Sequence, residues 1–522
     1  MTRPALDASR WPADAYDRRA LPERVLQFGT GMLLRALPLA MIDAANRAGA
    51  RAGRVVVVQS TPRGAAATLN AQDGLFTLVE RGVEQGAPVE RVRLVGSVSR
   101  ALVATDEWDA VRDVAADPAL RAIVSNVTEA GFRLDPDELT MDAPLAAPGD
   151  RAPRSFPAKL ADLLYTRFRR APEAPPLLVI PTELVDDNGP RLRAMVERLA
   201  ARVADAGPFR DWLARSVGFH SSLVDRITTG APAAAAREEL ESRLGYRDEL
   251  LTVAEPYAFW AVEGEPAALH AALPIDVARP PAEGAERQVV FASDIERFRT
   301  RKIRLLNGAH TALAPLACLA GIRTVREAAR HPQLGPCLHR VLYDEIVPAL
   351  ELGVAEATAF AASVEDRFGN PWLDHEWTVI ATNQTVKMRL RVIPSLLAYA
   401  AKQGEVPNAL ALAVAAYLRY ARDGGDGVGS WRGRSYTLND PDLALLTRHW
   451  RAAGPGDPSE GIATETLERV AASASADAAL WGESLARIPG LVAALTRWLV
   501  TLEREGVDGA LETLLVATAR SR

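Results

Sequence analysis

The amino-acid sequence predicts an α/β protein in which an N-terminal Rossmann-like domain with a mainly parallel sheet precedes a mainly α-helical domain. In the first half, short β-branched runs alternate with helical stretches, a pattern typical of a parallel sheet covered by helices. After about residue 290, helical periodicity dominates and strand-like runs nearly disappear. The chain has 522 residues, of which 48% are hydrophobic, enough for two packed domains. We therefore predict one domain over residues 1–290 and a second over residues 291–522.

The predicted strands of the first domain are short apolar runs. RVVVVQS is almost all valine, as expected for a strand buried on both faces. LFTLVERG and VRLVGSV flank a segment with glycine and proline, which predicts an inserted β-hairpin. A helix is expected from about Met32 to Arg47. The predicted strands lie at residues 24–28, 54–60, 75–82, 92–98, 122–127 and 176–181.

Composition and charge exclude several classes of protein. The formal net charge of −5 offers no basic excess for a nucleic-acid partner. Cys318 and Cys337 are the two cysteines, too few for a disulfide framework or a cysteine-rich zinc site, and they suit a reducing compartment. The N-terminus lacks the apolar core of a signal peptide, and no stretch approaches the roughly 18 apolar residues of a membrane span. We therefore expect a cytoplasmic protein without a membrane partner.

Gly29 and Gly31 lie where the first predicted strand gives way to the first predicted helix. Glycine lets the backbone turn tightly and lets a pyrophosphate approach the helix N-terminus, where unpaired N–H groups favour anions. The third glycine of the common dinucleotide fingerprint is replaced by Leu34. An ordinary strand-to-helix turn is the alternative, but the position after the first strand of a βαβ pattern favours a nucleotide cofactor.

The end of the second predicted strand bears on the choice of cofactor. An acidic residue often grips the ribose hydroxyls of NAD at this point. Here the strand ends with Gln59 and Ser60, followed by a loop that contains Arg63 and no carboxylate. Arg63 could meet the 2′-phosphate of NADP or could simply be solvated, so the choice between NAD and NADP stays open.

The segment KIRLLNGAH carries the candidate catalytic residues Lys302, Asn307 and His310. On a helix that turns about 100° per residue, they fall near 0°, about 140° and about 80°, on one face. Carbonyl reduction needs a proton donor and a neutral group that steadies the developing charge, which a lysine with a lowered pKa and an asparagine amide can supply. A polar helix surface is the alternative. The apolar flanks and the unfavourable Asn-Gly pair within a helix favour a cleft instead.

Two other kinds of site are disfavoured. His331, Cys337 and His339 are close in sequence, but their spacing matches no common metal-ligand pattern. No G-x-S-x-G motif follows a strand, which argues against a serine hydrolase. A non-catalytic sugar or nucleotide sensor is a further alternative, although a sensor needs no proton donor.

The chain resembles the polyol-specific long-chain dehydrogenases, also called the mannitol dehydrogenase family. The resemblance extends over nearly the whole chain and depends on ten segments in the same order. These segments are residues 26–36, 69–78, 125–132, 183–189, 221–230, 255–260, 302–310, 344–350, 367–377 and 386–396.

Several segments are similar to the branch of this family that acts on hexuronates, notably NVTEAG, ELVDDNG and NQTVKMRLRVIPSL. This resemblance implies NAD-dependent interconversion of D-tagaturonate and D-altronate in hexuronate catabolism, without a metal. Reduction of fructuronate, or oxidation of a mannitol- or arabinitol-type polyol, is the alternative within the family.

The resemblance also implies a role for particular residues around a cleft between the two domains. It makes Lys302 the general acid/base, Asn307 a ligand of the carbonyl oxygen and His310 a substrate contact. The residues that it places at the cofactor are Gly29, Gly31, Arg35, Thr128 and Glu129. From their place at the ends of the first two predicted strands, we add Thr30, Gln59 and Ser60 as candidate cofactor contacts. The residues that it places near the substrate are Asp225 and Arg226, and we add Asn383, Lys387 and Arg391 as candidates from their residue types and spacing.

Three points remain open at the substrate side. Asp225 and Arg226 could equally form a structural ion pair. The family's Asp-Asn pair is replaced by Glu183-Leu184, so Asn188 or Asn383 would have to serve as a second oxyanion donor. A hexuronate carboxylate needs a cation, and we look for it among Lys387, Arg389 and Arg391, with an exposed basic helix as the alternative.

Overall fold

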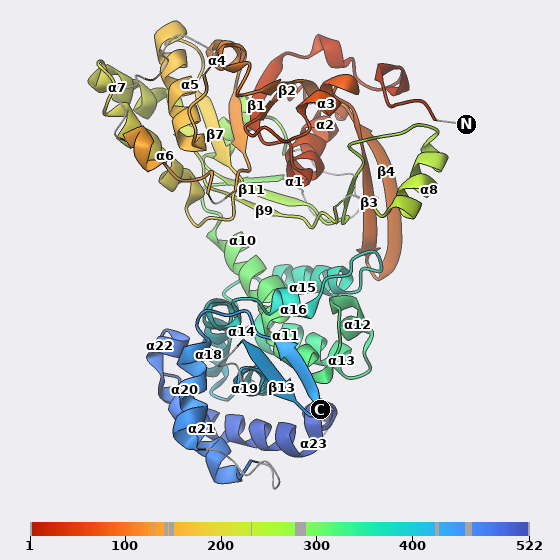
Figure 1. Ribbon diagram of the computed structural model, residues 1–522, viewed down its shortest axis with the longest axis vertical. Helices are drawn as coiled ribbons and strands as arrows, with labels where there is room; N and C mark the ends of the chain where they lie inside the picture. The colour runs from red at the N-terminus through yellow and green to blue at the C-terminus, as the bar shows by residue number, and fades with distance from the viewer. Residues whose placement is uncertain are drawn as a thin grey trace. The chain divides into compact units, whose positions relative to one another are not determined.

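The computed structural model divides the chain into two compact units (Figure 1). The first comprises Met1–Arg81 and Val89–Glu296, and the second comprises Gly82–Pro88 and Arg297–Arg522. The predicted boundary near residue 290 would cut strand β12 (Val289–Ala292), which pairs with β11 (Phe259–Glu263) inside the first unit. The division falls instead within helix α10 (Glu296–Arg301). The structure describes residues 3–128, 130–139, 145, 151–230, 232–276, 289–422, 427–454 and 462–519.

The first unit is built on a six-stranded sheet with the order β5-β2-β1-β6-β7-β8. All neighbouring pairs in this sheet are parallel. The chain runs outward from β1 in both directions, so the strand order reverses beside β1, where open α/β sheets bind their ligands. This arrangement confirms the predicted Rossmann-like domain. The strands are β1 (Glu23–Phe28), β2 (Arg54–Gln59), β5 (Val98–Val103), β6 (Ala122–Ser125), β7 (Leu177–Pro181) and β8 (Val217–Phe219).

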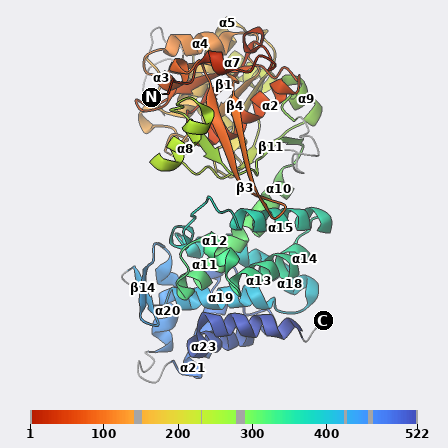
Figure 2. The same cartoon turned by 90° about the vertical axis from the view of Figure 1, so that its right-hand side faces the viewer.

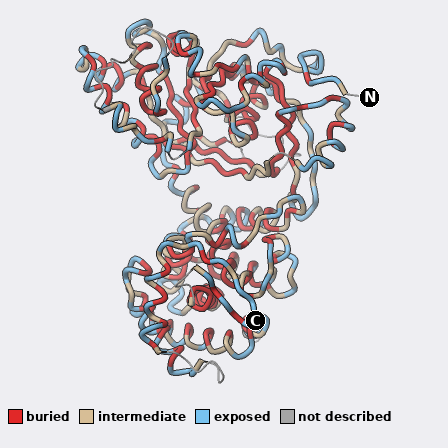
Figure 3. The backbone as a smooth tube through the Cα atoms, in the orientation of Figure 1, coloured by how far each residue is buried: buried red, intermediate tan, exposed pale blue. Residues whose placement is uncertain are grey.

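Helices cover both faces of this sheet, and its strands are buried (Figure 3). In β2, Val55 and Val57 pack into one core while Val56 and Val58 pack into the other, because successive side chains of a strand point to opposite faces. The predicted helix from Met32 to Arg47 is confirmed as a continuous series of α1, the π-helical turn η3 and α2. The bounds of the helices are α1 (Met32–Leu34), η3 (Arg35–Leu39), α2 (Ala40–Arg47), α3 (Ala66–Ala71), α4 (Trp108–Ala116), α5 (Phe156–Arg170), α6 (Asn188–Ala200) and α7 (Ala206–Ser216).

Two smaller sheets complete the first unit. The predicted hairpin is present as β3 (Phe76–Glu84) and β4 (Ala87–Val95), joined by β10 (Thr252–Ala254). Its predicted second strand was placed wrongly at 92–98, across the break between β4 and β5. The other sheet has the order β12-β11-β9, with β9 at Ser222–Asp225. Helices α8 (Ala234–Leu244) and α9 (Pro266–Ala272) accompany these sheets.

The second unit is mainly helical, as predicted. Helix α19 lies side by side with α23 and is buried from Ala409 to Tyr420 (Figure 2). Within the described ranges, no helix is long and apolar enough to cross a membrane. The hairpin of β13 (Val428–Trp431) and β14 (Arg434–Thr437) lies between helices α19 and α20 in the chain. The helices are η6 (Lys302–Asn307), α11 (Gly308–Ala320), α12 (Val325–Arg330), α13 (Leu334–His339), η7 (Arg340–Ile346), α14 (Val347–Ala349), α15 (Val354–Phe368), α16 (Trp377–Ile380), α17 (Gln384–Lys387), η8 (Met388–Val392), α18 (Ile393–Gln403), α19 (Asn408–Tyr420), α20 (Leu443–Ala453), α21 (Thr464–Ala476), α22 (Ala478–Trp481) and α23 (Leu491–Ala519).

A buried carboxylate anchors the start of α19. Glu345, in the π-helical turn η7, accepts hydrogen bonds from the backbone N–H groups of Ala409 and Leu410 at 2.7 and 2.8 Å. These donors belong to the first turn of the helix and have no partner within it. Burial raises the pKa of Glu345 to about 7 despite these two hydrogen bonds. The central helix of the second unit therefore depends on one side chain from a distant part of the chain.

We expect Glu345→Ala to lower the free energy of unfolding by about 3 kcal/mol, because it leaves two buried N–H groups without an acceptor. Urea denaturation followed by circular dichroism measures this loss. Glu351→Ala, which removes an exposed carboxylate nearby, is the matched control and should change stability by less than about 0.5 kcal/mol. Equal losses in the two variants would contradict the anchoring role.

Candidate active site

The turn after β1 has the backbone that a nucleotide-binding loop requires. Gly29 has a φ of +118°, and a Cβ at this position would lie 2.7 Å from Leu34 Cδ1 and 3.0 Å from the carbonyl oxygen of Asn126. Gly31 is the N-cap residue of the helical stretch that starts at Met32. A Cβ on Gly31 would meet no atom within 4 Å. Glycine is therefore required at Gly29 by the fold. At Gly31 the space above the helix N-terminus is open, as the approach of a pyrophosphate requires.

Arg35 and Thr30 hold this turn in place. The buried Arg35 donates from Nη1 to the carbonyl oxygen of Thr30 at 2.6 Å and from Nε to Thr252 Oγ1 at 2.9 Å. Burial lowers the pKa of Arg35. The hydroxyl of Thr30 accepts a hydrogen bond from the N–H of Ala65, which joins the turn to the loop after β2. Arg35 thus links the turn to Thr252 through hydrogen bonds on the buried side.

The loop after β2 leaves one buried hydroxyl without a partner. The amide of Gln59 is used within the loop, since Nε2 donates to the carbonyl oxygen of Thr61 and Oε1 accepts from the N–H of Ala66. Ser60 Oγ is buried and has no hydrogen-bond partner among the described residues. An unsatisfied buried hydroxyl is costly unless a ligand completes it. Together with the open space over Gly31, it indicates that this edge of the sheet fits a dinucleotide.

The segment after β6 completes this edge of the sheet. Asn126 donates to the carbonyl oxygen of Thr182 at 3.1 Å, and the buried Glu183 accepts from the N–H of Val127 at 2.8 Å. Burial raises the pKa of Glu183. The hydroxyl of Thr128 accepts a weak hydrogen bond from the N–H of Gly131 at 3.3 Å. Glu129, the other residue predicted here, lies outside the described residues.

In the second unit, the predicted catalytic segment is a π-helical turn. Lys302–Asn307 forms η6, which continues into α11 from Gly308. The angular spacing predicted for a regular α-helix therefore does not apply across these six residues, because a π turn is wider. Such turns occur frequently at functional sites. A Cβ at Gly308 would lie 3.3 Å from the carbonyl oxygen of Arg391 on η8, a tight contact that favours glycine in the Asn-Gly pair.

Lys302, Asn307 and His310 differ in their surroundings. Lys302 and Asn307 are half-buried, and the Asn307 side-chain amide hydrogen-bonds to no described residue. His310 is buried and its ring lies 4.1 Å from that of Phe368, measured between centroids. Its Nδ1 is 3.0 Å from the carbonyl oxygen of Leu306, which can only accept, so Nδ1 carries the proton. Nε2 is then a free acceptor for a hydroxyl group.

Burial and nearby positive groups keep His310 neutral. Burial lowers its pKa well below the usual value, and the charges of His375, Arg367 and Arg391 act in the same direction. The ring of His375 lies 5.5 Å from that of His310. The pKa of His375 is itself lowered by burial and by the charge of Lys387. The structure therefore brings one predicted substrate residue, Arg391, near the predicted catalytic histidine, while Lys387 acts on the neighbouring His375.

The three candidate partners of a substrate carboxylate have different environments. Arg389 donates to the carbonyl oxygens of Leu480 and Ala479, and Lys387 Nζ donates to that of Ile380 at 2.7 Å. The Arg391 side chain makes no hydrogen bond or ion pair within the described part of the chain. Burial lowers the pKa of Arg391, so its charge is partly desolvated and lacks a counterion.

Asn383 precedes this basic helix in a left-handed conformation, with a φ of +54°. Asparagine tolerates this region better than most residues. Its backbone N–H donates to the carbonyl oxygen of Asn439, while its side chain hydrogen-bonds to no described residue. A polar side chain held at a strained turn is a common feature of ligand sites.

Two other predicted positions are engaged in the fold of the first unit. Arg226 is buried and donates from Nη2 to Glu80 Oε1 at 2.5 Å and from Nη1 to the carbonyl oxygen of Ala36. This geometry favours the structural alternative for Arg226. Its neighbour Asp225 is buried at the end of β9. The amide of Asn188 contacts three carbonyl oxygens, those of Pro181, Glu183 and Ser222, which leaves Asn383 as the better candidate for a second oxyanion donor.

Comparison with known proteins decides the family. Residues 23–274 match the model of the mannitol dehydrogenase Rossmann domain, and residues 294–476 match that of the mannitol dehydrogenase C-terminal domain. The chain belongs to the mannitol dehydrogenase family. Membership confirms the predicted resemblance and makes the chain an oxidoreductase.

Relatives in this family extend over nearly the whole chain. The altronate oxidoreductase of Klebsiella pneumoniae is 37% identical over 502 residues, which cover 94% of this chain and 97% of the relative. That of Cronobacter sakazakii is 36% identical, with coverage of 94% and 97%. The Pseudomonas fluorescens mannitol 2-dehydrogenase ternary complex with NAD and D-mannitol is 25% identical, with a TM-score of 0.64 and coverage of 98% and 99%. A substrate-free D-sorbitol dehydrogenase, 22% identical with a TM-score of 0.76 and coverage of 97% and 100%, shares the fold.

The sequence alone indicates no role for two basic residues, His375 and Arg304. His375 lies in the segment RFGNPWLDHEW, one of the ten that carry the family resemblance, and its position beside His310 appears only in the fold. Arg304 lies within KIRLLNGAH and donates from Nε to Ser395 Oγ at 2.7 Å. Burial lowers the pKa of Arg304 to about 10, and no carboxylate within the described ranges pairs with it. Arg304 adds positive charge to the surroundings of η6, whereas burial and the charge of Lys387 favour the neutral form of His375.

The residues considered for a metal do not form a cluster. His331 Nδ1 accepts from the N–H groups of Gln333 and Leu334, and His339 Nδ1 is 3.0 Å from Glu365 Oε1. Over the part of the chain that the structure describes, no group of three or more His, Cys, Asp or Glu side chains could hold a metal ion.

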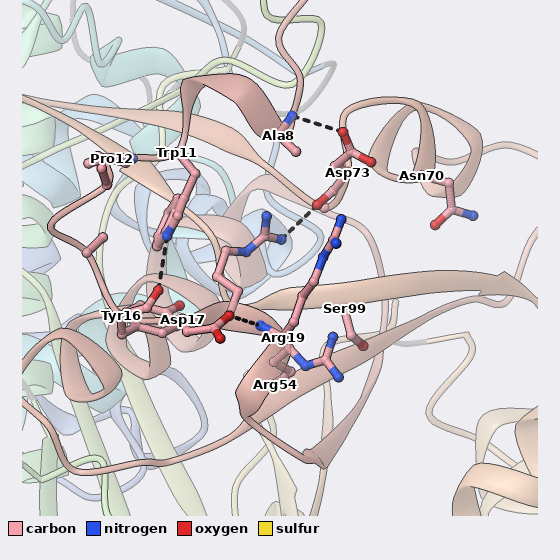
Figure 4. Close-up of a pocket in the computed structure, with 14 residues that line it drawn as sticks. Ala8, Trp11, Pro12, Tyr16, Asp17, Arg19, Arg54, Asn70, Asp73 and Ser99 are labelled. Carbon is pink, nitrogen blue, oxygen red and sulfur yellow. Dashed lines mark hydrogen bonds between the residues drawn. The ribbon is translucent and has the colours of Figure 1, made fainter.

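A separate cavity of about 510 Å³ lies at the start of β2, at the opposite end of this strand from the loop that carries Ser60. Its lining includes Arg54, the first residue of β2, together with Arg19, Asn70 and Ser99 (Figure 4). None of the predicted site residues lines it. This cavity therefore does not mark the predicted active site.

The two glycines of the cofactor turn should respond differently to substitution. We expect Gly29→Ala to lower the melting temperature by several degrees, because the added methyl group meets Leu34 and the backbone of Asn126 at a positive φ. Gly31→Ala should leave the melting temperature unchanged while raising the Kd for NADH about tenfold or more, since it fills the open space over the helix N-terminus. Differential scanning fluorimetry and nucleotide fluorescence titration measure the two effects. The opposite pattern would show that Gly31, not Gly29, is structural.

Proposed function

We propose that this chain is an NAD(H)-dependent dehydrogenase that interconverts D-tagaturonate and D-altronate without a metal, as a step of hexuronate catabolism. The whole-length relatives named altronate oxidoreductase support this substrate, and the mannitol 2-dehydrogenase solved with NAD supports the cofactor. The main support for an acidic sugar as substrate comes from Arg391. Its side chain is a partly buried cation that has no counterion among the described residues and lies near the neutral His310. A carboxylate would neutralise it.

In this proposal each unit makes a distinct contribution. The Gly29–Gly31 turn and Ser60 bind the cofactor, which supplies the hydride. The Lys302 ammonium donates a proton to the carbonyl oxygen during reduction and its amine accepts that proton during oxidation. The Asn307 amide donates to the oxygen as negative charge develops on it.

The imidazole of His310 orients the substrate. Its protonated Nδ1 is bound to Leu306, so Nε2 accepts a hydrogen bond from a sugar hydroxyl. Because burial and neighbouring charges keep the ring neutral, it does not compete with Lys302 as a proton donor. The positive charge of Arg391, which acts on His310, favours an anionic substrate.

The direct test is oxidation of NADH at 340 nm with tagaturonate, fructuronate and fructose in parallel. Preference for tagaturonate, seen as the highest kcat/KM, is the expected result. Preference for fructuronate or fructose would keep the reaction class but overturn the substrate. Binding of NADH without turnover of any of these sugars would favour a sensor.

We expect Lys302→Met to lower kcat about 10³-fold, since it removes the proton donor while keeping the length of the side chain. The Kd for NADH, measured by fluorescence titration, should stay within about twofold, because the cofactor turn belongs to the first unit. A variant that keeps more than a tenth of the wild-type kcat would exclude Lys302 as the general acid/base.

Arg391→Met should raise KM for tagaturonate about tenfold to a hundredfold, as expected for loss of a charge-assisted contact. KM for a neutral ketose should change by less than about threefold. Arg330→Met, at an exposed arginine without a described partner, is the matched control. Equal effects of Arg391→Met on both sugars would assign Arg391 a structural role.

A further inference from the structure

The loop after β2 bears on which nicotinamide cofactor this chain accepts. In proteins selective for NAD, a carboxylate at the end of the second strand binds the ribose hydroxyls and repels the 2′-phosphate of NADP. In this chain the last residue of β2 is Gln59, and the next residues up to Ala65 carry no acidic side chain. The feature that excludes NADP elsewhere is absent from this strand and loop.

Gln59 does not substitute for that carboxylate. Its amide is turned into the loop, where Oε1 binds the N–H of Ala66 and Nε2 binds the carbonyl oxygen of Thr61 at 2.9 Å. Gly64 packs against it so closely that a Cβ would lie 2.5 Å from Gln59 Oε1. Gln59 therefore shapes the loop and is not available to a ribose.

Ser60 is available instead. Its hydroxyl is buried and has no hydrogen-bond partner among the described residues, directly after the strand end where the ribose hydroxyls are usually bound. A hydroxyl can donate to or accept from either a ribose hydroxyl or a phosphate oxygen. Unlike a carboxylate, it does not discriminate against a 2′-phosphate.

Arg63 supplies a positive charge to the same loop. Its side chain is exposed and makes no hydrogen bond or ion pair with a described residue. Thr61 Oγ1 donates to the backbone carbonyl oxygen of Arg63 at 2.6 Å and folds the loop into a compact turn. Arginine binds phosphate with several directed N–H groups, so a free arginine here suits a 2′-phosphate.

Carboxylates are present on the neighbouring turn after β5, which is joined to the strand end by the hydrogen bond from Ala104 N–H to the Gln59 carbonyl oxygen. Glu107 is turned back to its own strand, where Oε2 accepts from the N–H of Val103 at 2.7 Å. Asp106 is exposed. Neither lies in the loop that carries Ser60 and Arg63.

We propose that this chain binds NADP(H) as well as NAD(H), with Ser60 serving the ribose and Arg63 the 2′-phosphate. The inference rests on the proposed function, since it concerns the cofactor of the same reaction. It assigns Arg63 a role in selecting the cofactor.

The test is fluorescence titration of the full-length protein with NADH and with NADPH, in the absence of any sugar. We expect the two Kd values to lie within about thirtyfold of each other. Arg63→Ala should raise the Kd for NADPH about tenfold or more and that for NADH less than about twofold. Arg198→Ala, at another exposed arginine of the first unit without a described partner, is the control and should change neither value.

A second variant tests Ser60. Ser60→Asp restores a carboxylate to the loop and should raise the Kd for NADPH at least tenfold relative to that for NADH. A wild-type preference for NADH of more than about thirtyfold, an equal effect of Arg63→Ala on both nucleotides, or an unchanged ratio in Ser60→Asp would overturn the inference. Failure of the wild-type protein to bind either nucleotide would overturn the proposed function as well.

Discussion

The buried Arg226 joins three parts of the first unit: the sheet that contains β3, the sheet that contains β9, and the helical stretch that follows the Gly29–Gly31 turn. Arg226 follows β9 and bonds to Glu80 on β3, to the backbone of Glu255 beyond β10, and to Ala36 on the helical stretch after β1. A fully desolvated guanidinium is tolerated only when its donors are satisfied, and removal of one partner leaves a costly charge behind. The two smaller sheets and the cofactor helix must therefore adopt one mutual arrangement.

In the second unit, the corresponding constraint is the close approach of two helices at Gly308. A Cβ on Gly308 would lie 3.3 Å from the carbonyl oxygen of Arg391, a tight contact that glycine avoids where η8 packs against the start of α11. The charges of Arg391 and Arg367 act on His310. Since most of these groups are partly desolvated, their mutual repulsion is stronger than it would be in water. Arg391 keeps a positive charge without a counterion among the described residues, and an anionic ligand would neutralise it.

The sequence predicts the central sheet well because its strands are nearly continuous apolar runs. β1, β2, β6 and β7 all come from such runs, whereas β8, β9 and β10 are only three or four residues long and carry no clear periodicity. Gly29 and Gly31 could be identified from their place after a strand. The π-helical form of η6 could not, because the segment KIRLLNGAH is compatible with a regular helix until its packing against η8 is known.

Charged side chains mark the limit of prediction at the candidate site. Lys387, Arg389 and Arg391 are equivalent in the sequence, and what separates them is contact with Ile380, Leu480 and Ala479. The Asp225-Arg226 motif was equally ambiguous, because a buried ion pair and a ligand site use the same residue types. Only tertiary contacts decide such cases, since hydrogen-bond partners come from distant parts of the chain.

The four consecutive valines of β2 have a consequence for how the strand finds its alignment. Val55 to Val58 alternate between two cores, yet each could serve either core equally well, so a shift by one residue would bury the same side chains. The alignment must therefore be specified at the ends of the strand. Arg54 Nε binds the carbonyl oxygen of Leu21 at one end. At the other end, the Gln59 carbonyl oxygen accepts from the N–H of Ala104 after β5, while the Gln59 amide folds the loop after β2. The residues that shape the cofactor loop thus also encode the register of the sheet, and neither property can change independently of the other.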